Sequence, residues 1–123
     1  MILVDTSVWI EFFRGNPAYF QELSRLIEER KIMALGCVFG ELLQGARSER
    51  EVKIIEQFWA QLLQINEVDV WIQAGKLSFE GKWHSKGVGL IDLAIVVAAR
   101  KNQCRIWTLD KKLQSALNPS EVF

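Results

Sequence analysis

The sequence contains few of the residues on which several large classes of protein depend. Its 123 residues include one histidine, His84, and two cysteines, Cys37 and Cys104, which lie far apart and outside any CxxC pair. A disulfide framework or a zinc site needs more of these residues, so both are excluded. The two cysteines are therefore predicted to be reduced core residues of a cytoplasmic protein.

The motifs of two common enzyme classes are also missing. No GxSxG elbow occurs, and a single histidine without a positioned nucleophile does not make a Ser/His/Asp triad. No GxxxxGK[ST] loop occurs either, and the glycines at 87 and 89 are too few for a phosphate-binding loop. The sequence therefore favours neither a serine hydrolase nor a P-loop nucleotide-binding protein.

Long hydrophobic runs and a net charge are absent as well. The longest nearly apolar run, residues 88–99, contains Asp92 and is shorter than the span of about 20 residues that crosses a membrane. Residues 1–4 lack the basic start of a secretion signal, so neither a membrane segment nor a signal is expected. Fifteen basic residues balance fifteen acidic ones, which argues against purely electrostatic binding of nucleic acid. A metal site made of carboxylates, however, would leave the remaining surface more basic.

Half of the residues are hydrophobic and 24% are charged, as in an ordinary globular domain, and residues 1–123 are predicted to form one domain. Short apolar runs predict strands at residues 2–4, 32–35, 65–68 and 105–108. Helical spacing of apolar residues predicts helices at 8–14, 18–31, 36–46, 49–63, 69–83 and 90–101, with a short one after Asp110. This alternation predicts an α/β fold with a mostly parallel sheet of about four to five strands and helices on both faces.

Acidic residues stand where the predicted strands end or the following helices begin. They are Asp5, Glu41, Asp92 and Asp110. Ligands of open α/β sheets bind beyond the carboxyl ends of the strands, so these side chains are candidates for a common site. Asp5 and Asp110, taken singly, are better explained as helix N-caps.

Glu41 and Asp92 stand inside runs of apolar side chains and are predicted to be buried. Burial of an unpaired carboxylate is costly, and no basic residue is adjacent to Asp5, Glu41 or Asp92 in the sequence. A divalent cation is the most economical counter-charge, and an all-oxygen donor set favours Mg²⁺ or Mn²⁺ over zinc. Such ions activate a bound water to attack the phosphorus of a phosphodiester, so phosphodiester hydrolysis is the predicted chemistry.

Four segments in this order resemble a known family. They are VDTS at residues 4–7, ELLQGAR at 41–47, DLAIVVAA at 92–99 and TLD at 108–110. Together they resemble a PIN domain over the whole chain, and within that family the VapC-type toxins of toxin–antitoxin systems. After Asp92 the family usually runs through Ile-Ala-Ala, from which residues 94–99 depart while keeping the helical pattern.

The resemblance implies a three-layer α/β/α fold and a metal-dependent endoribonuclease. It implies that one or two Mg²⁺ or Mn²⁺ ions are held by the catalytic residues Asp5, Glu41, Asp92 and Asp110. Thr6 and Thr108 match polar positions that support the site by hydrogen bonds. The family also implies a homodimer and an antitoxin that inserts a C-terminal segment beside the active site.

Three other functions are alternatives to the toxin. A PIN nuclease of RNA processing would share the same site, and a non-catalytic PIN fold that binds protein would be free to lose the acids. A phosphoacceptor receiver domain is disfavoured, because it needs a second acid next to Asp5, where Thr6 and Ser7 stand.

Several residues keep two interpretations at this stage. Asp110 is either a metal ligand or only a helix cap. Arg47 binds a phosphate or an antitoxin carboxylate, or it is a solvated surface residue. Trp71, Phe79 and Trp83 belong to the core or to a surface that contacts a second copy or an antitoxin.

Overall fold

The sheet consists of four parallel strands. In a computed structural model that describes residues 1–123, they are β1 (Ile2–Val4), β2 (Ile32–Ala34), β3 (Leu63–Gln64) and β4 (Arg105–Trp107). The spatial order is β3-β2-β1-β4, so β1 lies in the middle and pairs with both β2 and β4. The register places Val4 opposite Trp107, and the carboxyl ends of β1 and β4 therefore lie side by side.

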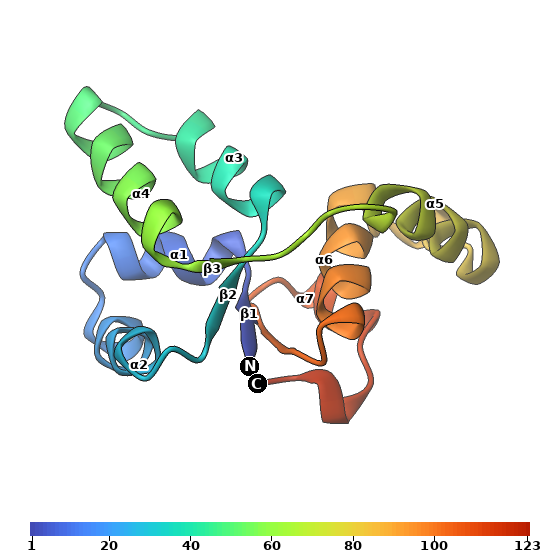
Figure 1. Ribbon diagram of the computed structural model, residues 1–123. Helices are drawn as coiled ribbons and strands as arrows, with labels where there is room; N and C mark the ends of the chain where they lie inside the picture. The colour runs from blue at the N-terminus through green and yellow to red at the C-terminus, as the bar shows by residue number, and fades with distance from the viewer.

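Seven α-helices and two short 3₁₀ helices surround the sheet. The α-helices are α1 (Thr6–Phe13), α2 (Pro17–Glu28), α3 (Gly36–Gln44), α4 (Glu49–Gln61), α5 (Val70–Gly81), α6 (Leu90–Lys101) and α7 (Lys111–Ser115). The 3₁₀ helices are η1 (His84–Lys86) and η2 (Pro119–Glu121). Helices α1 to α4 lie on one side of the sheet and α5 to α7 on the other, which confirms the predicted three-layer α/β/α fold (Figure 1).

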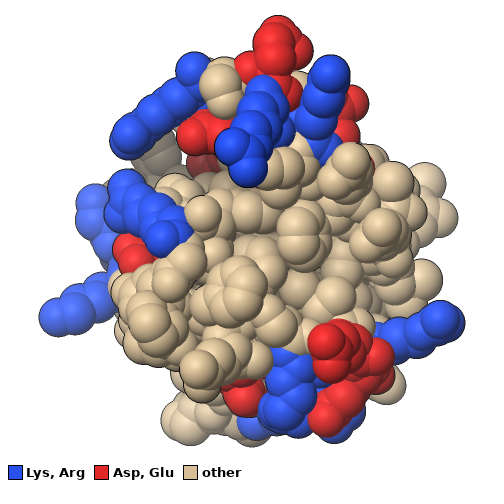
Figure 2. All heavy atoms as spheres, turned by 90° about the vertical axis from the view of Figure 1, so that its left-hand side faces the viewer, with Lys and Arg blue, Asp and Glu red and all other residues tan.

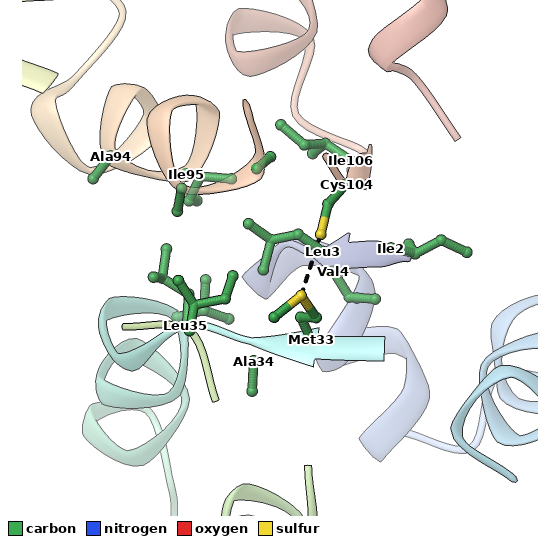
Figure 3. Close-up of a cluster of buried hydrophobic side chains, with 14 of the residues drawn as sticks. Ile2, Leu3, Val4, Met33, Ala34, Leu35, Ala94, Ile95, Cys104 and Ile106 are labelled. Carbon is green, nitrogen blue, oxygen red and sulfur yellow. Dashed lines mark hydrogen bonds between the residues drawn. The ribbon is translucent and has the colours of Figure 1, made fainter. Parts of the chain in front are cut away.

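The core lies between the sheet and the helices. All three residues of β1 and of β2 are buried, because both faces of a parallel sheet are covered. Helix α6 is buried over seven successive residues, 93–99, because it packs against the sheet on one side and α5 on the other. Figure 3 shows Ala94 and Ile95 of this helix facing the side chains of β1 and β2.

Both cysteines are free thiols, as predicted. Cys104 is buried, and its Sγ lies 3.5 Å from Sδ of Met33 (Figure 3). Cys37 is half-buried; burial, together with the negative charges of Glu67 and Glu41, raises the pKa of its thiol to about 12. A thiol with so high a pKa is a poor nucleophile at neutral pH.

The predicted third strand is misplaced by two residues. Helix α4 ends at Gln61, and β3 pairs residues 63–64 with β2, whereas the prediction placed this strand at 65–68. The strand ends early because the Asn66 side chain accepts a hydrogen bond from the Val68 N–H and forms a turn. Asp69 then precedes α5 in the left-handed conformation (φ 65°), and its side chain makes no capping hydrogen bond.

The two chain ends lie at the amino edge of the sheet, away from the strand ends that concern function (Figure 1). There the N–H of Phe123 donates to the Ile106 carbonyl oxygen at 2.9 Å. None of the helices combines the length and the apolarity that crossing a membrane requires.

Candidate active site

Asp5 and Asp110 are placed by neighbouring strands. Asp5 follows β1 directly, and its N–H donates to the carbonyl oxygen of Trp107 on β4 at 2.9 Å. Asp110 follows β4 after two intervening residues and is the N-cap of α7. The parallel pairing of β1 and β4 thus brings two strand-to-helix corners together at the carboxyl edge.

Asp5 is buried and held by two hydroxyl groups. Its exposed fraction is 7%, and its Oδ2 accepts hydrogen bonds from Ser7 Oγ at 2.9 Å and Thr108 Oγ1 at 2.7 Å. The side chain makes no capping bond to α1, so it is not an ordinary N-cap. Its second oxygen, Oδ1, has no hydrogen-bond partner in the chain and is free to bind a ligand.

The hydroxyls of Ser7 and Thr108 join the two corners into one network. Thr108 Oγ1 accepts from the Asp110 N–H at 3.0 Å while it donates to Asp5, and Ser7 Oγ accepts from the Leu109 N–H at 3.0 Å. Asp110 is half-exposed, and its Oδ1 accepts from the Lys112 N–H at 2.9 Å, which confirms its helix-capping geometry. One carboxylate oxygen of Asp110 remains without a hydrogen-bond partner.

Glu41 lies on the outer face of α3 and is exposed, so its predicted burial is wrong. Val38, Phe39 and Leu42 turn toward the core, and a helix of 3.6 residues per turn then points residue 41 outward despite its apolar neighbours in sequence. Its carboxylate is nevertheless oriented, because Thr6 Oγ1 donates to Oε1 at 2.8 Å.

Asp92, the third residue of α6, is half-buried. Its Oδ2 accepts a hydrogen bond from the Gly89 N–H at 3.2 Å, which lowers its pKa, but burial and the negative charges of the three other acids outweigh this bond. The pKa of Asp92 is therefore raised above its usual value by burial first and then by Asp110, Asp5 and Glu41. The other three acids of the sequence prediction thus all lie within electrostatic reach of Asp92.

No basic side chain neutralises this cluster. The chain contains five ion pairs, and none of them includes Asp5, Glu41, Asp92 or Asp110. The acids are also not gathered tightly enough for three of them to ligate one ion directly. The arrangement suits a hydrated ion bound through one or two carboxylates, with the other acids reached through its water ligands.

Ser7 is the site residue that the sequence analysis missed. Its hydroxyl accepts the Leu109 N–H and donates to Asp5, so it bridges the two corners. The predicted supporting residues Thr6 and Thr108 both donate to acids of the cluster. The only signal for Ser7 was its hydroxyl at a strand end, and the spacing alone does not tell which of Thr6 and Ser7 turns toward Asp5.

A groove of about 330 Å³ adjoins the acids on the side of Glu41. Helices α1, α3 and α4 form it from apolar side chains such as Ile10 and Phe13, with Arg14 and Arg47 also lining it. Arg47 forms no ion pair, so its guanidinium is available to a partner. The side of the molecule that carries α1, α2 and α4 has a broad uncharged centre, with charged side chains around its margin (Figure 2).

Comparison with known proteins identifies relatives over nearly the whole chain. The PIN domain family model matches residues 2–117. Ribonuclease VapC32 of Mycobacterium tuberculosis is 34% identical over an alignment that covers 99% of this chain and 94% of that protein. Among solved structures, a toxin–antitoxin complex from Klebsiella pneumoniae superposes with a TM-score of 0.79 at 19% identity, covering 100% of this chain and 96% of that one. Mycobacterium tuberculosis VapC20, described as a sarcin–ricin loop cleaving toxin, superposes with a TM-score of 0.70 at 19% identity, covering 94% and 95%.

Proposed function

Because the chain belongs to the PIN-domain family, we propose that it is a Mg²⁺- or Mn²⁺-dependent endoribonuclease and the toxin of a type II toxin–antitoxin pair. The observation that carries the proposal is the cluster of four carboxylates at the carboxyl edge of the sheet, without a basic partner. The similarity to Ribonuclease VapC32 supports RNA as the substrate. Residues 1–123 would act as a single nuclease domain in the cytoplasm.

The donor set fits a hard divalent cation. The four acids offer only oxygen donors. Burial, and then the charges of its three acidic neighbours, destabilise Asp92 as an anion, and a bound cation would remove the repulsion among the acids. Asp5 Oδ1 is the best-placed ligand, because its partner oxygen is already fixed by two hydroxyls. Asp92, Glu41 and Asp110 would complete the site directly or through water.

The chain's own residues would mainly orient and hold the reacting groups. When bound, Mg²⁺ or Mn²⁺ activates water and neutralises negative charge on the phosphodiester. Ser7 and Thr108 keep the Asp5 carboxylate in one orientation, and Thr6 does the same for Glu41. Fixing the ligands in advance lowers the cost of assembling the site when RNA binds.

The first test is cleavage of total cellular RNA by the purified protein, freed of any antitoxin. Discrete fragments should form with Mg²⁺ or Mn²⁺ and disappear with EDTA, and the Asp5→Asn and Asp92→Asn variants should form none. Lys31→Gln, at the amino edge of the sheet, is a matched control that should cut like the wild type. Metal-dependent RNA binding without cutting, unchanged by the two acid substitutions, would instead support a non-catalytic PIN fold.

The partner that we propose for the groove beside Glu41 is a segment of the antitoxin. The groove joins apolar walls to the unpaired Arg47, so it suits a segment that carries apolar side chains and a carboxylate. The candidate antitoxin is the product of a short reading frame directly upstream that encodes a DNA-binding protein. The substitution Ile10→Glu should weaken its binding, whereas Val68→Glu, at an exposed aliphatic residue outside the groove, should not. Absence of such a reading frame would favour a role in RNA processing.

We also propose that two copies associate through α5. Ile72 and Phe79 are 71% and 85% exposed and stand seven residues apart, so they share one face of the helix, with the side-chain-free Gly75 between them. In an antiparallel pair of α5 helices, Ile72 meets Phe79, and Asp69 of one copy lies opposite Lys82 of the other. Such a face is self-complementary, as a twofold dimer requires.

Sedimentation measures this association directly. The wild type should sediment as a dimer and Phe79→Asp as a monomer, with Val68→Asp as the control for an added charge at another exposed aliphatic residue. Of the three aromatic residues considered from the sequence, Trp83 is half-buried in the following loop and is not part of this face. A Phe79→Asp variant that remains dimeric would place the contact elsewhere.

A further inference from the structure

A short basic loop lies next to the acidic cluster, and none of its basic side chains has a role in the site described above. Residues 82–89 connect α5 to α6 and contain Lys82, His84 and Lys86 but no acidic residue. The loop leads directly to Gly89, whose N–H holds the Asp92 carboxylate. Any cation on this loop therefore stands within a few residues of a candidate metal ligand.

Lys112 reaches the same loop from α7. Gly87 is left-handed (φ 80°), and a β-carbon placed on it would lie 3.6 Å from Lys112 Nζ and 3.8 Å from its Cε. The Lys112 side chain therefore lies against Gly87, while its backbone N–H donates to Asp110. One residue thus connects the acid that caps α7 with the loop that precedes α6.

Backbone hydrogen bonds and an aromatic contact restrict the position of Lys86. The carbonyl oxygen of Trp83 accepts hydrogen bonds from the N–H groups of Lys86 and Val88, both at 3.0 Å, and Val88 is buried. Lys86 Nζ lies 4.3 Å from the centre of the Trp83 ring, which restricts the flexible side chain. Neither Lys86 nor Lys112 forms an ion pair, so both ammonium groups can bind an anion.

We infer that Lys86 and Lys112 form a phosphate-binding site for single-stranded RNA, which takes a phosphate adjacent to the one that is cut. This inference rests on the proposed ribonuclease function. Four carboxylates repel a polyanion, and ions bound there offset this repulsion only at the phosphate that they contact. The next phosphate along the strand needs a cation of its own, and two unpaired lysines supply it, Lys86 from the loop before α6 and Lys112 from α7, which lies against that loop. They are positioning residues and do not touch the reacting atoms.

The test measures binding of a short fluorescein-labelled single-stranded RNA in EDTA over a series of salt concentrations. The slope of log affinity against log salt is negative, and each phosphate contact that is lost should reduce its magnitude by about 0.7. The magnitude should therefore fall by about 0.7 in Lys112→Gln and by up to about 1.4 in the double variant Lys86→Gln, Lys112→Gln. Lys112→Arg should restore the wild-type slope, and Lys31→Gln, at the opposite edge of the sheet, should leave it unchanged. The Asp110 cap survives in Lys112→Gln, because only the backbone of Lys112 contributes to it.

Cleavage kinetics separate this inference from the function on which it rests. With Mg²⁺ present, the double variant should show a raised KM and a nearly unchanged kcat, as expected when a contact is shared by bound substrate and transition state. A wild-type protein that cuts RNA while both lysine variants keep its salt slope and KM would overturn the phosphate site alone. A wild type that cuts no RNA in any metal would overturn the ribonuclease proposal itself.

Discussion

The two strand-to-helix corners at the ends of β1 and β4 look alike in sequence and differ in structure. In each, a short strand leads to an aspartate at the N-cap of a helix, directly after β1 and after two further residues beyond β4. Asp110 uses its carboxylate as a cap, accepting the Lys112 N–H, and it remains half-exposed. Asp5 is buried, leaves its helix uncapped, and accepts two hydroxyl hydrogen bonds instead.

Thr108 is the origin of this difference. It follows β4, but its hydroxyl donates to Asp5, which follows the neighbouring strand β1. The same hydroxyl oxygen accepts a hydrogen bond from the Asp110 N–H. A buried carboxylate needs hydrogen-bond donors, and Asp5 takes one from Ser7 in its own corner and one from Thr108 in the neighbouring corner, so its role depends on both segments. Asp5 thus keeps one oxygen free for the ion that we propose, and Asp110 has a structural role as a helix cap that is independent of any ion.

The largest effect is expected for Asp5→Asn. The substitution keeps an oxygen that can accept from Ser7 and Thr108 but removes the negative charge. If the charge contributes about 4 kcal/mol to stabilising the transition state through the ion, the rate of RNA cleavage falls about a thousandfold. Single-turnover cleavage measures the rate, and thermal unfolding in EDTA should show little change in Tm.

The Asp5→Asn result also tests whether the ion binds at this corner. Mg²⁺ should raise the Tm of the wild type, because it binds only the folded state, and should raise that of Asp5→Asn much less. An equal rise in Tm in both proteins would show that the ion binds without Asp5, and would contradict the proposal that Asp5 is the main ligand.

Thr108→Val should produce the next largest effect. It removes one of the two hydroxyls on Asp5 and leaves the Asp110 N–H without its acceptor. Loss of a residue that orients a metal ligand typically costs 10- to 100-fold in activity, so cleavage should fall by about this factor. The buried groups left unpaired should also lower the free energy of unfolding by about 1–3 kcal/mol. Denaturant unfolding measures the second effect.

Thr108→Ser is the matched variant, because it keeps the hydroxyl and loses only a methyl group. It should recover most of the cleavage activity, although the small cavity left at a buried position costs some stability. Activity as low as that of the valine variant would mean that the methyl group, and hence packing, is what matters at this position.

Asp110 distinguishes the two roles of an aspartate at a corner. Asp110→Asn keeps a good helix cap and removes only the charge, whereas Asp110→Ala removes both and should cost about 1 kcal/mol of stability. If Asp110 also binds the ion through water, both variants should lose cleavage activity equally, by about tenfold. Wild-type cleavage by Asp110→Asn would show that Asp110 is only a cap.

The sequence predicts most of this arrangement, but it does not predict the orientation of individual side chains at the site. The alternation of apolar runs predicts the layers and places the acids at one edge, because parallel strands end together. It does not predict that Ser7 and not Thr6 reaches Asp5, since that depends on the direction in which α1 leaves β1. The apolar neighbours of Glu41 in the sequence also predict, wrongly, that Glu41 is buried. Successive residues of a helix lie on different faces, so its neighbours face the core while Glu41 is exposed.

The smallest effect is expected for Thr6→Val. The hydroxyl of Thr6 orients Glu41 through one hydrogen bond at an exposed site, where water replaces it readily, so cleavage should fall only about threefold. The double variant Thr6→Val, Thr108→Val then reports on how the two acids act. If Glu41 and Asp5 bind separate ions, the fold-losses in cleavage rate of the two single variants should multiply in the double variant. If they share one ion, the double variant should lose less than this product, because either substitution alone already weakens binding of that ion. Rates of single-turnover cleavage for the four proteins of this cycle decide between one shared ion and two.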